Sequence, residues 1–482
     1  MTLTSLLRSA LPAAAFSLAI GIAPSFAGDP PEYVYLQLGT LGGPDSVGYG
    51  LNASGQVVGW SSIPDCITEA SETPCRRAYV WQDGVMTELG VLPGDDESFA
   101  RAINDAGLVV GTSEVGILFG SGTFHAVAWS GGAISALADL GESSVAHDVN
   151  ASGVVAGWAR DTSLNQDRAV TWSGGAINNP GATEPHQSNR FVGLNDFGIL
   201  VGLAWNLFQP NDAVLFDGVK WEDIGGLDGP FQNAEANDVN NTGTAVGLQA
   251  FPSGAWHAAL WVLGVGAIDA GTLPGKDYGE LYSVNDAGYA VGGSYTDPLD
   301  SVAVLWDGDT LHDLNDLLPA GVDAHLFEAR EINANGDIVG SALVDGHFRA
   351  FLMLADPEVG TWEDLGSALG GSAGEPALDG SGALIAGTQS TIELSNALPG
   401  ATARLVAGFG ELNAPFRGGV MVPTPDLMFP AQIVNGAGEL TLRTTWPGEV
   451  PSDFAFTMQY WIQDAGGALG WAASNGLRAT TP

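Results

Sequence analysis

One pattern of polar and apolar positions recurs along most of the chain. Each copy has an apolar residue, then Asn, two variable residues and Gly, then an apolar pair or triple and a second Gly. Asn at the first position and Gly at the fourth are typical of a tight turn, because Asn bonds nearby backbone and Gly reaches positive φ. The pattern therefore predicts seven hairpins. Their turn asparagines are Asn52, Asn104, Asn150, Asn195, Asn240, Asn285 and Asn333.

A second motif follows each hairpin. Five copies read Ala-x-x-Trp, and Phe216 and Met353 replace the Trp in the other two. A Gly-containing turn and a further apolar stretch come next, so each repeat predicts four short strands. An aromatic residue that recurs once per repeat is expected in the core. Arg or His precedes the Ala in five repeats, and we expect a structural role for the two histidines, His125 and His257. The other three residues at this position are Arg77, Arg168 and Arg349.

The spacing of the repeat indicates the architecture. Successive turn asparagines lie 52, 46, 45, 45, 45 and 48 residues apart. Four antiparallel strands in about 40–45 residues are typical of one blade of a β-propeller. The sequence thus predicts an all-β, seven-bladed propeller over residues 33–371, with an open β-solenoid as the alternative. Residues 33–43 and 361–366 both look like a fourth strand; we expect 33–43 to complete the last blade, and a partial eighth blade is the alternative.

The complete repeat resembles a known family. Asn-x-x-Gly-x-Val-Val-Gly, followed by His/Arg-Ala-x-x-Trp and Leu-Gly-x-Leu-x-Gly, is similar to the HAF-type repeat of bacterial extracellular repeat proteins. The resemblance covers residues 33–371 and implies an extracellular setting. It supplies no catalytic residues.

Beyond residue 371 the repeat stops. Alternating stretches at 390–394, 403–408, 439–445 and 454–462 predict a small β-sandwich over residues 375–482. This segment resembles a C-terminal module found on many secreted bacterial proteins, which implies a surface or secretion context. The residues that carry the resemblance are Gly418, Gly419, Pro423, Pro425, Gln459, Tyr460, Trp461, Asp464, Ser474, Asn475, Gly476 and Leu477.

The N-terminus predicts export. Arg8, an apolar run at 11–22 and a small-x-small site at 25–27 are typical of a signal peptide over residues 1–27. A membrane anchor is the alternative, although the run is shorter than the ~20 residues that a span needs. We therefore expect a location in the extracellular space, at the cell surface or in the periplasm. In such a compartment Cys66 and Cys75 predict a disulfide, with a pair of metal-ligating thiolates as the alternative.

Charge restricts the partners. The formal net charge is −40, with 55 acidic residues against 15 lysines and arginines. Such a field repels nucleic acids and anionic membranes, so we expect neither as a partner. No stretch beyond the N-terminal run could span a bilayer, so we expect no transmembrane segment in the mature chain. No His or Cys spacing predicts a metal site and no cofactor is expected. The acidic clusters at 95–97, 307–309 and 313–316 could hold Ca²⁺ loosely, and solvated loop acids are the favoured interpretation.

Loop length suggests where a ligand would bind. From the turn Asn to the Ala of the second motif the seven repeats measure 26, 22, 19, 18, 18, 18 and 17 residues. The extra length lies between the second and third strands of the first three repeats, at 61–76, 112–124 and 159–167. Insertions gathered on one face often mark a binding surface, and tolerated surface insertions are the alternative. The candidate binding residues are Trp60, Asp65, Glu69, Glu72, Phe119, Phe124, Trp158, Arg160 and Asp161.

These features favour a binding or scaffolding module that meets an extracellular protein or glycan. Two alternatives stay open: a carbohydrate-active enzyme, a lyase or hydrolase using loop-face carboxylates, and a purely structural surface component. The sequence has neither a Gly-x-Ser-x-Gly elbow nor a Walker loop, and it names no catalytic residue. The enzyme is the less favoured hypothesis because no residue breaks the repeat in the way that an inserted catalytic loop would.

Overall fold

The computed structural model describes residues 30–67, 74–115, 123–182, 186–206, 210–225, 233–297, 299–319, 321–355, 359–447 and 450–482. The predicted signal peptide lies outside these ranges. Within them the chain is built from β-strands and one short 3-10 helix, η2 (Leu314–Leu317). No helix in this part of the chain is long and apolar enough to cross a bilayer.

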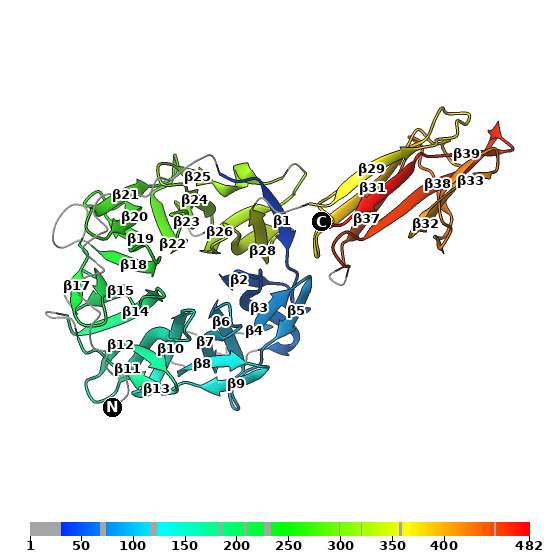
Figure 1. Ribbon diagram of the computed structural model, residues 1–482. Coiled ribbons are helices and arrows are strands. Elements are labelled where there is room, and N and C mark those ends of the chain that lie inside the picture. Colours follow the sequence, from blue (N-terminus) through cyan, green and yellow to red (C-terminus); the bar gives the residue numbers. More distant parts are fainter. Residues whose placement is uncertain are drawn as a thin grey trace, which may run out of the picture.

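Seven four-stranded antiparallel units form the blades of a propeller, arranged in a ring (Figure 1), and one parallel pair, Trp256 with Tyr278, joins the fifth and sixth units into a single sheet. Blade 1 comprises β2 (Ser46–Leu51), β3 (Val57–Ile67), β4 (Pro74–Gln82) and β5 (Val85–Glu88). Blade 2 comprises β6 (Glu97–Ile103), β7 (Val109–Glu114), β8 (Phe124–Ser130) and β9 (Ala133–Ala136). Blade 3 comprises β10 (Gly141–Val149), β11 (Val155–Asp161), β12 (Gln166–Ser173) and β13 (Ala176–Asn178). Blade 4 comprises β14 (Ser188–Leu194), β15 (Leu200–Trp205), β16 (Asp212–Phe216) and β17 (Trp221–Asp223). Blade 5 comprises β18 (Ala234–Val239), β19 (Thr244–Ala250), β20 (Trp256–Val262) and β21 (Gly266–Gly271). Blade 6 comprises β22 (Tyr278–Val284), β23 (Ala290–Tyr295), β24 (Val302–Trp306) and β25 (Leu311–Asp313). Blade 7 comprises β26 (His325–Ile332), β27 (Ile338–Val344), β28 (His347–Ala355) and the N-terminal strand β1 (Tyr33–Gln37).

The N-terminal strand closes the ring, as predicted. β1 pairs antiparallel with β28, with Tyr33 opposite Ala355 (dark blue beside β28 in Figure 1). β29 (Thr361–Gly366), the competing candidate, pairs instead with β40 (Gly476–Thr480) of the C-terminal unit. The predicted boundary at residue 371 is therefore wrong, because β1 already occupies the fourth place of blade 7 and β29 finds its partner elsewhere. The propeller ends with β28.

The repeat motifs have the local structure that the sequence predicts. In the first turn the Gly55 N–H donates to the Asn52 carbonyl at 3.1 Å, and Gly55 has a φ of +76°. The Ala and Trp of the second motif are core residues: Ala126 is fully buried and Trp129 is 1% exposed. The cation before the Ala has a structural role, since Arg168 Nη1 donates to the Gln187 carbonyl at the entrance to the next blade.

A β-bulge interrupts each innermost strand three residues before its turn Asn. In β2 the pairing register shifts between Gly48 and Gly50, and equivalent shifts occur in β6, β10, β14, β18, β22 and β26. The second Gly of the motif faces this bulge, where a Cβ on Gly59 would lie 2.0 Å from the Val47 carbonyl oxygen. That Gly is thus required by close backbone approach. The bulge also directs one side chain of every blade into the central channel.

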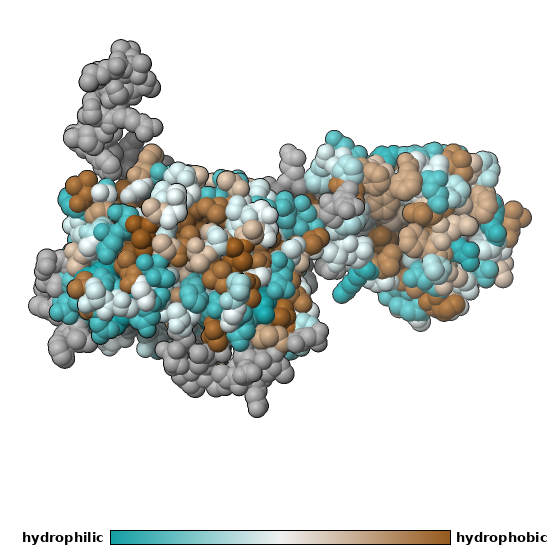
Figure 2. Space-filling model, turned by 90° about the horizontal axis from the view of Figure 1, so that it is seen from below, coloured by the Kyte–Doolittle hydropathy of each residue, from teal (hydrophilic) through white to brown (hydrophobic). Residues whose placement is uncertain are grey.

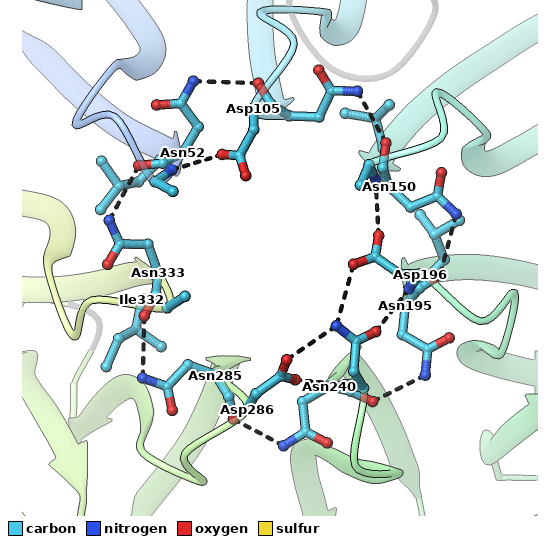
Figure 3. A pocket seen from close by; sticks show the side chains of 18 of the residues that line it. Asn52, Asp105, Asn150, Asn195, Asp196, Asn240, Asn285, Asp286, Ile332 and Asn333 are labelled. Carbon is cyan, nitrogen blue, oxygen red and sulfur yellow. Dashed lines mark hydrogen bonds between the residues drawn. The ribbon is translucent and has the colours of Figure 1, made fainter.

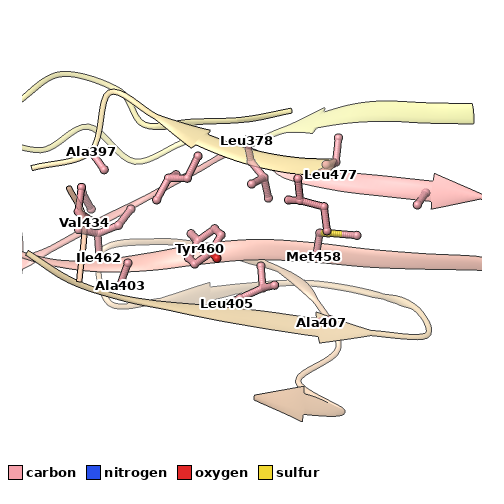
Figure 4. Packing of buried hydrophobic residues seen from close by; sticks show 14 of the residues in the cluster. Leu378, Ala397, Ala403, Leu405, Ala407, Val434, Met458, Tyr460, Ile462 and Leu477 are labelled. Carbon is pink, nitrogen blue, oxygen red and sulfur yellow. The ribbon is translucent and has the colours of Figure 1, made fainter. Parts of the chain in front are cut away.

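The C-terminal unit is a β-sandwich outside the ring, as predicted (Figure 1). One sheet contains β29, β40, β38 (Ala455–Ala468) and β32 (Thr402–Gly408), extended by β35 (Leu427–Met428), β36 (Gln432–Ile433) and β39 (Trp471–Ala473). The other contains β30 (Ala377–Ser381), β31 (Gln389–Ser395) and β37 (Leu440–Thr445), and β33 (Glu411–Phe416) forms a separate hairpin with β34 (Gly419–Pro423). Buried Leu378 of one sheet packs in a single cluster with Leu405 and Tyr460 of the other (Figure 4).

A disulfide joins Cys66 of β3 to Cys75 of β4, with the two Cα atoms 5.3 Å apart. These strands extend well into the predicted loop 61–76, which is therefore largely a long hairpin in its described part. The strands β11 and β12 likewise extend into 159–167.

Candidate binding site in the central channel

A closed ring of hydrogen bonds lies at the turn end of the channel. The side-chain Nδ2 of each turn Asn donates to the backbone carbonyl of the turn Asn in the next blade, at 2.9–3.2 Å. The seventh bond returns from Asn333 to the Asn52 carbonyl at 3.1 Å (Figure 3). All seven residues are buried. The asparagines therefore hold neighbouring blades together, a role beyond the turn that the sequence indicates.

Seven side chains of five different residue types line the middle of the channel. They occupy the bulged position of each blade, and together they border a cavity of about 290 Å³. They are Tyr49, Arg101, His147, Val192, Asn237, Tyr282 and Arg330. The scaffold around them repeats closely while this position varies. The sequence signal for these residues is a position that varies three places before an invariant Asn, and the patterns of turns and loop lengths do not indicate it.

Buried acids beside the bulges link blades to one another. Asp148 accepts a hydrogen bond from the Leu194 N–H at 2.8 Å, and Asp238 accepts one from the Val284 N–H at 2.9 Å. Burial raises the pKa of Asp148 to about 7, and repulsion from Asp238 adds to this shift. Burial also raises the pKa of Glu280 to about 7, although Asn237 Nδ2 donates to its carboxylate at 2.9 Å. Asp148 and Glu280 are therefore partly neutral near pH 7.

A larger cavity, about 480 Å³, opens where the innermost strands begin, at the strand ends away from the Asn ring. Blades 1 to 4 provide its lining: Tyr49, Arg76, Phe99, Arg101, Thr112, Glu114, Phe124, Val145, His147, Trp158 and Arg190. We call this cavity the channel mouth. It combines aromatic rings with arginines, a composition that suits an anionic ligand with a flat or apolar face.

Two of the three arginines in the channel mouth already have carboxylate partners. Arg76 Nη2 lies 2.8 Å from Glu97 Oε2, and its guanidinium lies 4.6 Å from the centre of the Phe99 ring. Arg190 pairs with Asp167 and lies 4.1 Å from the ring centre of Trp158. Both guanidinium groups are thus held in place against aromatic rings.

Arg101 has no such partner. Its Nε atom is buried and makes no hydrogen bond within the described structure, and burial lowers the pKa of its guanidinium. Burial lowers the pKa of His147 well below its ordinary value, and repulsion from Arg101 and Arg190 adds to this shift. Glu114 lines the same cavity and attracts Arg101, but burial raises the pKa of its carboxyl group to about 7, so it balances the charge of Arg101 only in part.

Charge is unevenly distributed around the channel. Five residues before the turn Asn, blades 5 to 7 carry Glu235, Glu280 and Glu328, whereas blades 1 to 4 carry Val47, Phe99, Val145 and Arg190. Glu328 pairs with Arg330, and Asn211 Nδ2 donates to Glu235 at 2.8 Å. An anionic group is therefore favoured on the side of blades 1 to 4 and repelled from the other.

The candidate residues from the sequence lie in three environments. Phe124 and Trp158 line the channel mouth. Trp60 meets Phe99 edge-on with ring centres 6.4 Å apart, and it lies within a strand instead of at a loop. Arg160 pairs with Asp167 at 2.8 Å, and Asp161 accepts a hydrogen bond from Ser163 in the same hairpin. Glu69, Glu72, Phe119 and the side chain of Asp65 lie outside the described residues.

The acidic clusters that could hold Ca²⁺ have partners of their own. Asp95 lies 3.1 Å from His125, Asp307 lies 2.6 Å from His312, and Asp313 caps η2. Within the described ranges, no three His, Cys, Asp or Glu side chains are grouped so that they could hold a metal ion.

Comparison with known proteins adds little to this picture. No family model and no curated protein matches the sequence. Among solved structures, acylaminoacyl peptidase from Pyrococcus horikoshii matches with a TM-score of 0.36 and 12% identity, over 70% of this chain and 48% of the peptidase. The chain thus spans about half the length of that enzyme. Trypanosoma rangeli sialidase in complex with the inhibitor DANA matches with a TM-score of 0.33 and 7% identity, over 94% of this chain and 91% of the sialidase. The resemblance is one of β-propeller architecture. At these scores it carries no argument about function.

Proposed function

We propose that this protein is an exported binding module whose channel mouth takes an acidic glycan at the cell surface or in the extracellular matrix. The observation that carries the proposal is the guanidinium of Arg101, which makes no hydrogen bond to a carboxylate and lines a cavity that also holds aromatic rings. A ligand carboxylate would provide the missing hydrogen-bond acceptor. Phe99 and Phe124, which are partly exposed in the same cavity, would pack against the apolar face of a sugar ring.

We also infer that the propeller consists of HAF-type repeats like those of bacterial extracellular proteins. The recurrence of three motifs in fixed order supports this assignment. So does the disulfide, which fits an oxidising compartment. Export remains an expectation from the N-terminal sequence.

Hydrolysis or elimination of a glycan is a second candidate function, favoured by one residue. Burial raises the pKa of Glu114 in the channel mouth to about 7, as a general acid or base requires. Most glycosidases need a second carboxyl group about 5–9.5 Å away. Among the described residues that line the channel mouth, Glu114 is the only carboxylic acid, so binding is the better-supported function.

Titration calorimetry with oligogalacturonates, and with neutral galacto-oligosaccharides of the same length, tests the proposal. We expect the acidic ligands to bind more tightly, and Arg101→Gln to weaken them by about tenfold or more, because hydrogen bonds to charged groups contribute about 1.5–3 kcal/mol. Arg443→Gln is the matched control, since Arg443 is an exposed arginine on β37 outside the channel.

Equal binding of neutral and acidic sugars would contradict the proposal, as would unchanged binding in Arg101→Gln. Release of shorter products by the wild type, abolished in Glu114→Gln, would establish the enzymatic alternative instead.

A further inference from the structure

A second cavity lies in the C-terminal sandwich. Its floor is the outer face of β32 and β38, where Val406 and Trp461 are buried, and the β33–β34 hairpin forms one wall. Phe416 of that hairpin meets Trp461 edge-on, with ring centres 4.9 Å apart. The cavity measures about 500 Å³. We call it the sandwich groove.

The sandwich groove is lined mainly by apolar side chains, and several of them are exposed. Leu412 is 46% exposed, Phe416 38% and Met428 67%, and all three border the groove. Figure 2 shows apolar residues on the surface of this unit among hydrophilic ones. Contiguous apolar surface of this kind is typical of a binding site, because burying it from water is favourable.

Two arginines provide the only charges among the described residues that line the groove. Arg404 projects from the outer face of β32, where it is the cross-strand neighbour of Trp461. Arg417 lies in the two-residue turn of the β33–β34 hairpin at a φ of +50°, and its guanidinium lies 3.7 Å from the ring centre of Trp471.

Both groove arginines lack acidic partners. Most described arginines of this acidic chain bond a carboxylate or a carbonyl. The described arginines without a hydrogen bond or ion pair are Arg101, Arg404, Arg417 and Arg443. Two of these four border one apolar groove, so the groove presents unpaired positive charge beside apolar surface.

We propose that the sandwich groove binds a single-chain anionic amphiphile, such as a medium-chain carboxylate. The alkyl chain would cover the exposed apolar side chains, and the carboxylate would accept hydrogen bonds from Arg404 and Arg417. A sugar fits less well, since Thr402 and Gln463 are the only uncharged polar side chains in the described lining. Addition of a peptide strand is also disfavoured, because β32 already pairs with β38 on one side and with β35 and β36 on the other.

Titration calorimetry of the full chain with octanoate and decanoate, below the concentrations at which they form micelles, tests this proposal. We expect one site per chain and an affinity that rises about fourfold with each added methylene, from the transfer free energy of a CH₂ group. The net charge of −40 repels anions elsewhere on the surface, so carboxylate binding reports a local site. Decanol, which has a similar chain without the charge, is expected to bind at least tenfold more weakly.

Arg417→Gln alone is expected to weaken decanoate binding at least tenfold, and so is the double variant that combines it with Arg404→Gln. Arg443→Gln changes the net charge equally, lies on the other sheet, and is expected to bind like the wild type. Decanol that binds as tightly as decanoate would overturn the proposal, as would equal weakening by Arg443→Gln or the absence of decanoate binding. Sedimentation that shows a dimer requiring Phe416 would identify a second copy of the chain as the occupant and would also overturn it.

Discussion

The ring of asparagines at the turn end of the channel makes a quantitative prediction about stability. Replacing Asn195 by Ala removes three hydrogen bonds at once. Its Nδ2 donates to the Asn240 carbonyl at 3.0 Å, while its Oδ1 accepts from the Phe197 N–H at 3.0 Å and the Ile199 N–H at 2.9 Å. Asn195 is only 4% exposed, so water cannot easily replace these bonds.

The expected loss follows from the net contribution of each bond. At about 1 kcal/mol per hydrogen bond, with a further cost for donors left unsatisfied, Asn195→Ala lowers the free energy of unfolding by about 3 kcal/mol. For a propeller of this length, an unfolding entropy of about 2 cal/mol/K per residue converts this loss to a decrease of about 4 °C in Tm. Calorimetry and denaturant unfolding of the purified chain measure both quantities.

Two further variants separate the ring from the turn. Phe197→Ala changes an exposed residue of the same turn and is expected to leave Tm within about 1 °C, as surface substitutions usually do. Asn195→Asp keeps the oxygen that accepts the two N–H groups, and Asp suits a type I turn. It nevertheless places an oxygen against the Asn240 carbonyl, so we expect it to be destabilising. An Asp variant as stable as the wild type would refute the blade-linking role.

Four other outcomes test the structure. Thiol titration in denaturant without reductant is expected to find no free thiol, since Cys66 and Cys75 are bonded; two free thiols would contradict this. Removal of residues 28–43 exposes the edge of β28, and aggregation or a lower Tm is expected; an unchanged monomer would argue against closure by β1. Burial raises the pKa of Glu280 from 4.5 to about 7, so the folded chain holds this proton more tightly than the unfolded chain, and wild-type stability falls as the pH rises from about 5 to 7. Glu280→Gln is expected to reduce that fall by about 2–3 kcal/mol, and identical pH profiles would disprove the pKa shift. Arg101→Met removes a partly buried guanidinium without a partner and is expected to raise stability by about 1 kcal/mol, whereas a loss would show that Arg101 has a structural role.

The sequence by itself determined the local structure and the repeat. The Asn-x-x-Gly turns, the four strands per repeat, the buried Trp and the disulfide all depend on residues close together in the chain. The preference for an N-terminal closing strand also came from the sequence, because only one of two candidate strands could complete seven blades. These predictions succeeded because turn geometry and strand periodicity are short-range properties.

Only the tertiary structure decided how the blades meet and where a ligand could bind. The bond from Asn195 to Asn240 crosses 45 residues and exists because the ring curves back on itself. The bulges that direct Arg101 and His147 into one channel depend on pairing between strands. The channel mouth joins residues from four blades, and β29 pairs with a strand more than a hundred residues later. Contacts of this kind are fixed by closure of the whole ring and by competition for strand edges, which no local pattern records.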